Sequence, residues 1–293
     1  MREIKVYAPA KINLYLDVLN KRPDGYHNIE TLFEKIDLKD EIVIKEKGKG
    51  LKVKTNLAEC PWGKDNIVYK AIQALSIEAK INLNLDIIIK KAIPVSAGLG
   101  GGSSDAASAL KAVNKIFDLG IEEKQLFSIA SNIGKDAPFF MLDNSFVIGR
   151  GSGELLEPLN IKNSFSHIII KPKIPISTAE MYKKIDNHKA RSKKSNIEKI
   201  VYALKKKDIT LLEKNYYNIF EEVLGGYGNC IKKVKDLFFK AGVRHSILSG
   251  SGPSVFCTFQ DTKEAVRIFG KIPKGKDIKI FLVTTYRGGY LWK

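Results

Sequence analysis

A glycine-rich turn that opens into a helical pattern is the segment of this chain best suited to chemistry. The stretch PVSAGLGGGSSDAA at 94–107 ends its turn with two serines, Ser103 and Ser104. Glycines let backbone N–H groups approach an anion closely, and the first turn of a helix favours phosphate. The spacing matches neither the Walker A loop nor the dinucleotide-binding GxGxxG motif, and a purely structural turn is the alternative. We nevertheless predict that residues 94–104 bind phosphate. They are Pro94, Val95, Ser96, Ala97, Gly98, Leu99, Gly100, Gly101, Gly102, Ser103 and Ser104.

Strands and helices alternate along the whole chain and would position this loop. Apolar and polar residues alternate over 11–18, which predicts a half-buried strand with Lys11 and Asn13 on one face. Further strands are expected at 41–45, 51–54, 81–90, 146–151, 167–171, 255–259 and 278–286. Helices are expected at 66–76, 106–117, 122–133, 196–206, 229–241 and 262–271. We predict an α+β fold of two domains, 1–158 and 159–293, around a central cleft.

The bulk composition excludes several classes of protein. The chain of 293 residues is 44% hydrophobic and 28% charged, which is a globular composition. No apolar run approaches the length of a membrane helix and the N-terminus lacks a signal-peptide pattern, so we expect a cytoplasmic protein without a membrane partner. Cys60, Cys230 and Cys257 show neither zinc-ligand nor disulfide spacing.

The formal net charge of +17 raises the possibility of a nucleic-acid partner. Residues 183–207 contain ten Lys/Arg and two Asp/Glu, so 10 − 2 = +8 of that charge lies in one block. The block has one aromatic residue and no nucleic-acid-binding motif, so we interpret it as a solvated helix face or a lysine-rich loop. A basic RNA-binding protein would instead show steeply salt-dependent RNA affinity and no ATP turnover. We expect no nucleic-acid partner.

Three segments in order resemble the GHMP kinases, the superfamily of galactokinase, homoserine and mevalonate kinases. They are APAKINLYL at 8–16, the glycine loop, and LSGSGPSVFCTF at 248–259. The resemblance spans nearly the whole chain. It implies a two-domain GHMP fold, with an N-terminal nucleotide-binding domain and a C-terminal α/β domain, and ATP as co-substrate. Magnesium is implied by phosphoryl transfer, with its ligands left open between Ser103, Ser104 and the phosphates.

Within that superfamily, four features resemble the group that phosphorylates a cytidine-diphosphate-linked methylerythritol at its 2-hydroxyl. They are the segment 10–31 with its DGYH element, the expanded GLGGGSSDAA, GKDAPFF at 134–140 and GRGSGE at 149–154. This would place the enzyme in the non-mevalonate route to isoprenoids. The alternative is another GHMP small-molecule kinase, acting in the mevalonate pathway or on homoserine. We expect a monomer or weak homodimer.

The resemblance also implies the reacting groups. Asp136 occupies the position of the family's catalytic aspartate, and Lys11 that of its catalytic lysine. A positioned carboxylate can accept the proton of an alcohol, and a neighbouring lysine favours its ionised form. Asn66 matches a motif near the adenine pocket, although a helix N-cap explains it equally well.

Substrate contacts are implied at five positions. Asn13 lies on the strand face of Lys11 and is a candidate hydrogen-bonding group, or else a strand-surface amide. Tyr26 and His27 would bind the cytosine, and Tyr182 would stack on its other side. Thr178 matches a threonine near the substrate. Ala179 stands where the family commonly has proline, and Lys135 where it has a small residue; the role of Lys135 is left open.

Overall fold

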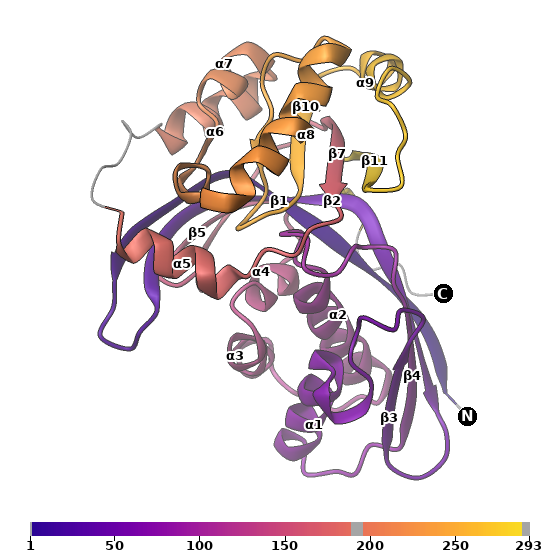
Figure 1. Cartoon of the computed structure of the whole chain (residues 1–293). Coiled ribbons are helices and arrows are strands. Elements are labelled where there is room, and N and C mark those ends of the chain that lie inside the picture. The colour runs from indigo at the N-terminus through magenta and orange to yellow at the C-terminus, as the bar shows by residue number, and fades with distance from the viewer. Residues whose placement is uncertain (1, 189–195, 289–293) are drawn as a thin grey trace.

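The structure is a computed structural model that describes residues 2–188 and 196–288. A long antiparallel hairpin, β1 (Glu3–Lys21) and β2 (His27–Glu46), forms the centre of a seven-stranded sheet (Figure 1). The far edge of β2 pairs with β4 (Leu85–Lys90) along one half and with β5 (Phe146–Arg150) along the other. The sheet is completed by β3 (Leu51–Thr55), β6 (Leu155–Leu159) and β8 (Tyr217–Asn218).

Helices of the first half cover one side of this sheet. They are α1 (Ile67–Glu78), α2 (Gly101–Ile116), α3 (Glu123–Ile133) and the short α4 (Ala137–Met141). The side chains of α2 that face the sheet are small or apolar, including Ala106, Ala109 and Val113. Small residues bring the helix close to the strands, which sets the position of the glycine turn at its N-terminus.

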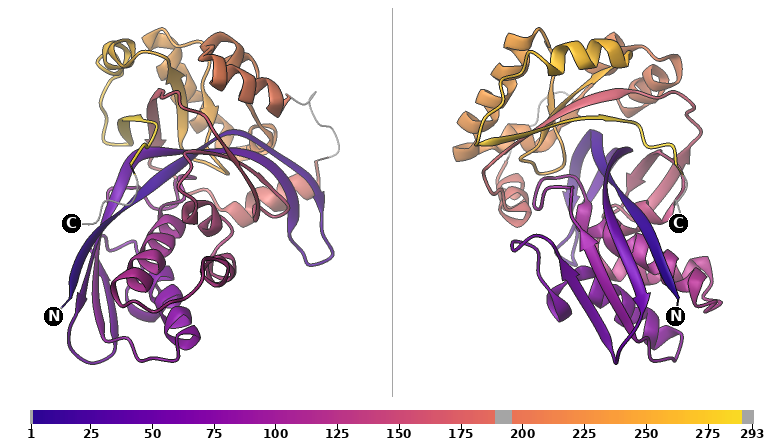
Figure 2. Two further views of the ribbon diagram at one scale, coloured as in Figure 1. Left: turned by 180° about the vertical axis from the view of Figure 1, so that it is seen from behind. Right: turned by 90° about the vertical axis from the view of Figure 1, so that its right-hand side faces the viewer.

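The second half of the chain builds a four-stranded sheet in the order β11 (Ile278–Thr284), β7 (Ser166–Pro172), β10 (Val255–Phe259) and β9 (Ile247–Leu248). Its helices are α5 (Thr178–Asp186), α6 (Ile197–Lys206), α7 (Ile209–Lys214), α8 (Gly228–Ala241) and α9 (Thr262–Phe269). Both views in Figure 2 place this half on the opposite side of the β1–β2 hairpin from α1–α4. The expected α+β architecture with two sheet-and-helix layers is therefore present.

The strand that carries Lys11 is buried on both faces, so the expectation of a half-buried strand was wrong. Ile12 and Leu14 are fully buried, and Lys11, Asn13 and Asp17 on the opposite face are 4%, 2% and 0% exposed. The physical reason is that helices cover one face of the hairpin while the second half of the chain covers the other. The polar alternation reports an internal polar face rather than contact with solvent.

Most predicted elements are present, with differences in extent. The strand expected at 81–90 begins only at Leu85, and α4, α5 and α7 were not predicted because each is short. The expected domain division at 158/159 falls inside β6 and stays a prediction. Part of the basic block, 189–195, lies outside the described residues; the rest forms the end of α5 and all of α6. Among the described residues, no helix is long and apolar enough to cross a membrane.

Candidate active site

Two adjoining cavities lie between the halves of the molecule. The first, of about 370 Å³, is lined by residues 94–103 together with Lys11, Asn13 and Asp136. The second, of about 710 Å³, is lined by Tyr26, His27 and residues of α5. The lining residues common to both are Ile29, Ser103, Asp136, Thr178 and Tyr182. Asp136 therefore stands where the two cavities meet.

The predicted phosphate loop, residues 94–104, wraps the first cavity. Gly98 and Gly100 adopt positive φ angles of 75° and 70°, which glycine adopts without strain, and α2 begins at Gly101. The N–H groups at the start of this helix are free of helical partners and can face an anion. Ser103 lines both cavities, whereas Ser104 is fully buried and its backbone N–H donates to the carbonyl of Gly100 (2.9 Å). The structure therefore favours Ser103 over Ser104 for direct contact with a ligand.

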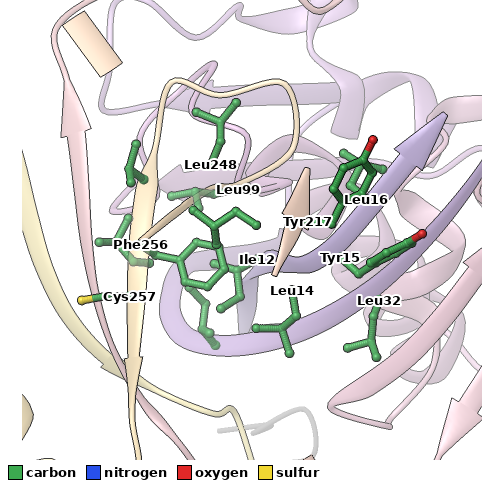
Figure 3. Close-up of a cluster of buried hydrophobic side chains, with 14 of the residues drawn as sticks. Ile12, Leu14, Tyr15, Leu16, Leu32, Leu99, Tyr217, Leu248, Phe256 and Cys257 are labelled. Carbon is green, nitrogen blue, oxygen red and sulfur yellow. The ribbon is translucent and has the colours of Figure 1, made fainter. Parts of the chain in front are cut away.

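A second glycine-rich segment, the C-terminal turn at 249–254, supports the phosphate loop. The Ser249 hydroxyl donates to the Gly98 carbonyl (3.0 Å), and the Ser254 N–H donates to the Ala97 carbonyl (3.4 Å). Leu99 of the loop and Leu248, which precedes the turn, are both buried in one apolar cluster with Ile12 (Figure 3). The two glycine motifs are thus anchored in a common core.

Lys11 and Asp136 are brought together, with the lysine ammonium 3.5 Å from an Asp136 carboxylate oxygen. The Lys11 side chain is 5% exposed and that of Asp136 35% exposed. Asn13 accepts a hydrogen bond from the Lys11 ammonium (2.6 Å) and donates to the hydroxyl of Thr31 (2.8 Å). Asn13 therefore orients Lys11, in addition to lining the first cavity.

A buried ionic cluster lies behind the phosphate loop, and sequence reasoning missed it. The Lys91 ammonium contacts carboxylates of Asp40 and Asp105, and Asp105 is the residue that follows Ser104 in α2. Asp40 also accepts hydrogen bonds from the backbone N–H groups of Ala92 and Ile93. Burial raises the pKa of Asp105 well above its usual range, and the nearby Lys91 charge opposes that shift. The cluster ties α2 to β2 and to the segment that enters the loop.

In the second cavity, Tyr182 stacks on His27, with ring centroids 4.9 Å apart. His27 forms a 2.6 Å contact through its Nε2 with Asp186, which is also paired with Lys21 (2.6 Å). These hydrogen bonds, from Lys21 and then His27, lower the pKa of the Asp186 carboxyl. Tyr26 is 51% exposed and carries the Lys135 ammonium 4.2 Å from its ring centre. The expected partners all line this cavity, but one face of Tyr182 is already covered by His27.

Two further predicted residues have clear local roles. Thr178 shares a 2.8 Å hydrogen bond with Ser251 of the C-terminal turn, which links α5 to that turn. Asn66 lines neither cavity: its side chain caps α1 by accepting from the Val68 N–H (2.8 Å) and donates to the Pro61 carbonyl (2.7 Å). The N-cap interpretation accounts for the side-chain oxygen, and the amide nitrogen is used by the contact with Pro61.

Asp186 was not predicted as a site residue. It lies in the lysine-rich block, where composition suggested a solvated surface. The spacing of the buried Met181 and Ile185 at i and i+4 could have indicated a helix there, and with it a face shared by Tyr182 and Asp186. Across residues 2–188 and 196–288, no group of three or more His, Cys, Asp or Glu side chains is arranged to hold a metal ion.

Comparison with known proteins places the chain in a family. The family described as "GHMP kinases N terminal domain" matches residues 66–144, and the family described as "GHMP kinases C terminal" matches residues 200–276. A 4-diphosphocytidyl-2-C-methyl-D-erythritol kinase of Acetivibrio thermocellus is 37% identical over 90% of this chain and 93% of its own length. One from Thermoanaerobacter pseudethanolicus is 35% identical over the full length of both chains.

Solved structures support the same family assignment. A crystal structure of 4-(cytidine 5'-diphospho)-2C-methyl-D-erythritol kinase matches with a TM-score of 0.80 and 29% identity, covering 97% of this chain and 100% of that one. A homoserine kinase of Cytophaga hutchinsonii matches with a TM-score of 0.79 at 21% identity, covering 100% and 98%, a likeness of fold alone. Because the chain is more than 30% identical to these relatives over nearly its full length, it belongs to the 4-diphosphocytidyl-2-C-methyl-D-erythritol kinase family of the GHMP kinases.

Proposed function

We propose that this protein transfers the γ-phosphoryl group of ATP to the 2-hydroxyl of 4-diphosphocytidyl-2-C-methyl-D-erythritol, giving the 2-phosphate and ADP. Membership of the family supports the reaction. The single structural observation that carries it is the position of Asp136, which lines both cavities and is paired with Lys11. A phosphoryl donor in the first cavity and an alcohol in the second would meet at this carboxylate.

In this proposal, the phosphate loop binds the triphosphate of ATP. The first residues of α2 line the first cavity, and the partial positive charge of a helix N-terminus complements phosphate oxygens. The positive φ angles of Gly98 and Gly100 let the main chain curve around the anion with no side chain in the way.

Asp136 accepts the proton of the attacking hydroxyl, and the Lys11 ammonium, 3.5 Å from its carboxylate, holds that group in position. The buried Lys11 also lies where negative charge develops as the phosphoryl group moves, so it stabilises the transition state electrostatically. The hydrogen bond to Asn13 holds the ammonium in this orientation.

Magnesium is compatible with the residues at the junction. In kinases this ion usually keeps several waters and binds through one or two protein oxygens plus the phosphates. The Ser103 hydroxyl lines both cavities and would supply one such oxygen. When bound, the ion neutralises charge on the β- and γ-phosphates.

His27, Tyr26 and Tyr182 bind the cytidine end in the second cavity. Asp186 accepts from His27 when Nε2 carries the proton, which leaves Nδ1 as the hydrogen-bonding atom for the base edge. Aromatic faces contribute roughly 1–3 kcal/mol per stacked base in single-strand binders. Location in the cytoplasm and a monomeric or weakly dimeric state stay predictions.

An ADP-release assay with three acceptors tests this function. The purified enzyme receives ATP and either the diphosphocytidyl alcohol, mevalonate or homoserine, with Asp136→Asn as the blank. Of the three acceptors, we expect only the diphosphocytidyl alcohol to give substantial ADP release. A higher kcat/KM with mevalonate or homoserine would refute the proposed substrate and favour another GHMP kinase.

A further inference from the structure

The second cavity carries an excess of positive charge after its ion pairs are accounted for. Its charged lining residues are Lys21, Lys135, Lys183, Asp136 and Asp186. Asp186 is paired with Lys21 and His27, and Asp136 is paired with Lys11. Among the described residues, neither Lys135 nor Lys183 forms an ion pair, although Lys135 interacts electrostatically with Asp24, which lies outside the lining of this cavity. A binding site with two such cations is suited to an anionic group.

Lys135 stands between the two ends of the predicted substrate site. It immediately precedes Asp136, the proposed proton acceptor, and its ammonium lies over the ring of Tyr26, which we assign to the base. In the proposed substrate, the diphosphate likewise stands between the cytidine and the methylerythritol. Lys183 follows Tyr182 in α5 and also lines the cavity. The order of groups along the cavity therefore matches the covalent order of the substrate.

The contact of Lys135 with Tyr26 does not oppose a role in binding. A cation over a half-exposed aromatic ring is a weak interaction, whereas an ammonium–phosphate hydrogen bond between two charged groups is a strong one. The four-carbon stem of lysine is flexible, so the ammonium can leave the ring for an anion nearby.

We propose that Lys135 and Lys183 bind the diphosphate of the cytidine-linked substrate. This inference rests on the proposed function. Lys135 lines the second cavity and is absent from the lining of the first, so we assign it to the cytidine substrate and not to ATP.

A ligand series separates the diphosphate contact from the base contact. Dissociation constants for cytidine, CMP, CDP and ATP are measured by calorimetry on the wild type, Lys135→Met, Lys183→Met and the double variant. Methionine keeps most of the stem and removes the charge. The matched control is Lys184→Met, because Lys184 is adjacent to Lys183 but is paired with Glu180 and lies outside the cavity.

We expect Lys135→Met to weaken CDP binding by roughly tenfold, as for loss of one charge-assisted hydrogen bond, and to leave cytidine and ATP unchanged. Lys183→Met should also weaken CDP binding more than cytidine binding, and Lys184→Met should leave the CDP-to-cytidine affinity ratio at its wild-type value. An unchanged ratio in Lys135→Met, an equal loss in Lys184→Met, or an equal loss for ATP would overturn the inference. If the wild type binds neither cytidine nor CDP, the proposed function itself fails and this inference falls with it.

Discussion

A methyl group at position 98 tests whether the phosphate loop depends on close contact with the C-terminal turn. The Cβ of Gly98→Ala would lie far inside van der Waals contact of the Ser249 carbonyl oxygen and 3.1 Å from that of Gly252. Both neighbours are backbone atoms, which cannot rotate away as a side chain can. The φ angle of +75° is also one that alanine rarely adopts. The substitution must therefore separate the two segments or distort the loop.

The cost follows from the contacts that would be lost. A left-handed backbone costs a non-glycine residue about 1–2 kcal/mol. Separation of the segments would also break the hydrogen bonds Ser249 Oγ to Gly98 O and Ser254 N to Ala97 O, each contributing about 1 kcal/mol. The total of about 3–4 kcal/mol corresponds to a fall in Tm of roughly 5–15 °C for a protein of this size.

Gly102→Ala is the matched control within the same loop. Its Cβ would meet only the Ile67 Cγ2 at 3.5 Å, an ordinary contact, and the residue already lies in α2. Alanine in a helix is favoured over glycine by about 0.5–1 kcal/mol, so this variant should keep or slightly raise the Tm. Thermal unfolding of both variants without ligand measures the difference. Equal Tm values for the two would refute the argument that Gly98 serves close packing of the segments.

Three further outcomes are expected. Asp136→Asn should lower kcat by about 100- to 10,000-fold while the Kd for ATP is unchanged, because it removes a proton acceptor and preserves shape; wild-type turnover would remove Asp136 from the mechanism. His27→Ala should raise the KM for the cytidine substrate far more than the KM for ATP, and equal rises would contradict its assignment to the base. Burial lowers the pKa of Lys35 to about 7, so between pH 7 and its unfolded pKa only the unfolded chain holds the extra proton. Lys35 should therefore make the free energy of unfolding rise with pH by about 1.4 kcal/mol per unit above pH 7, and Lys35→Met should lack this contribution in denaturation curves; identical pH slopes would refute it.

The sequence predicted the helix that follows the glycine turn better than it predicted the burial of the strand that carries Lys11. Helical spacing after the glycines correctly placed α2, because a helix with one buried face has a clear period. The strand at Lys11 was misjudged because its polar residues face the interior. Alternation distinguishes two faces of a strand, but it does not say what covers each one.

The role of the basic block shows a different limit. From the sequence, Lys183 and Asp186 were interpreted as solvated charges, because no neighbouring motif indicates a binding role for them. The partners of Asp186 are Lys21 and His27, at the far end of the β1–β2 hairpin, which meets α5 only in the folded chain. The meaning of such charges depends on long-range packing, which composition and spacing do not contain.

The backbone contact between Lys11 and the phosphate loop shows why sequence motifs can identify the residues of a site but not the distances between them. Lys11 and Asp136 are 136 − 11 = 125 positions apart, yet the Lys11 backbone N–H donates to the carbonyl of Leu99 (3.0 Å), so the strand that carries the lysine is joined to the loop. Any residue at position 99 could accept that bond, because every residue has a carbonyl. The side chains at 11 and 136 determine which chemistry is possible. The position of these side chains relative to the loop is set by main-chain contacts, and in the sequence such contacts show only as glycines, among them Gly98 and Gly100.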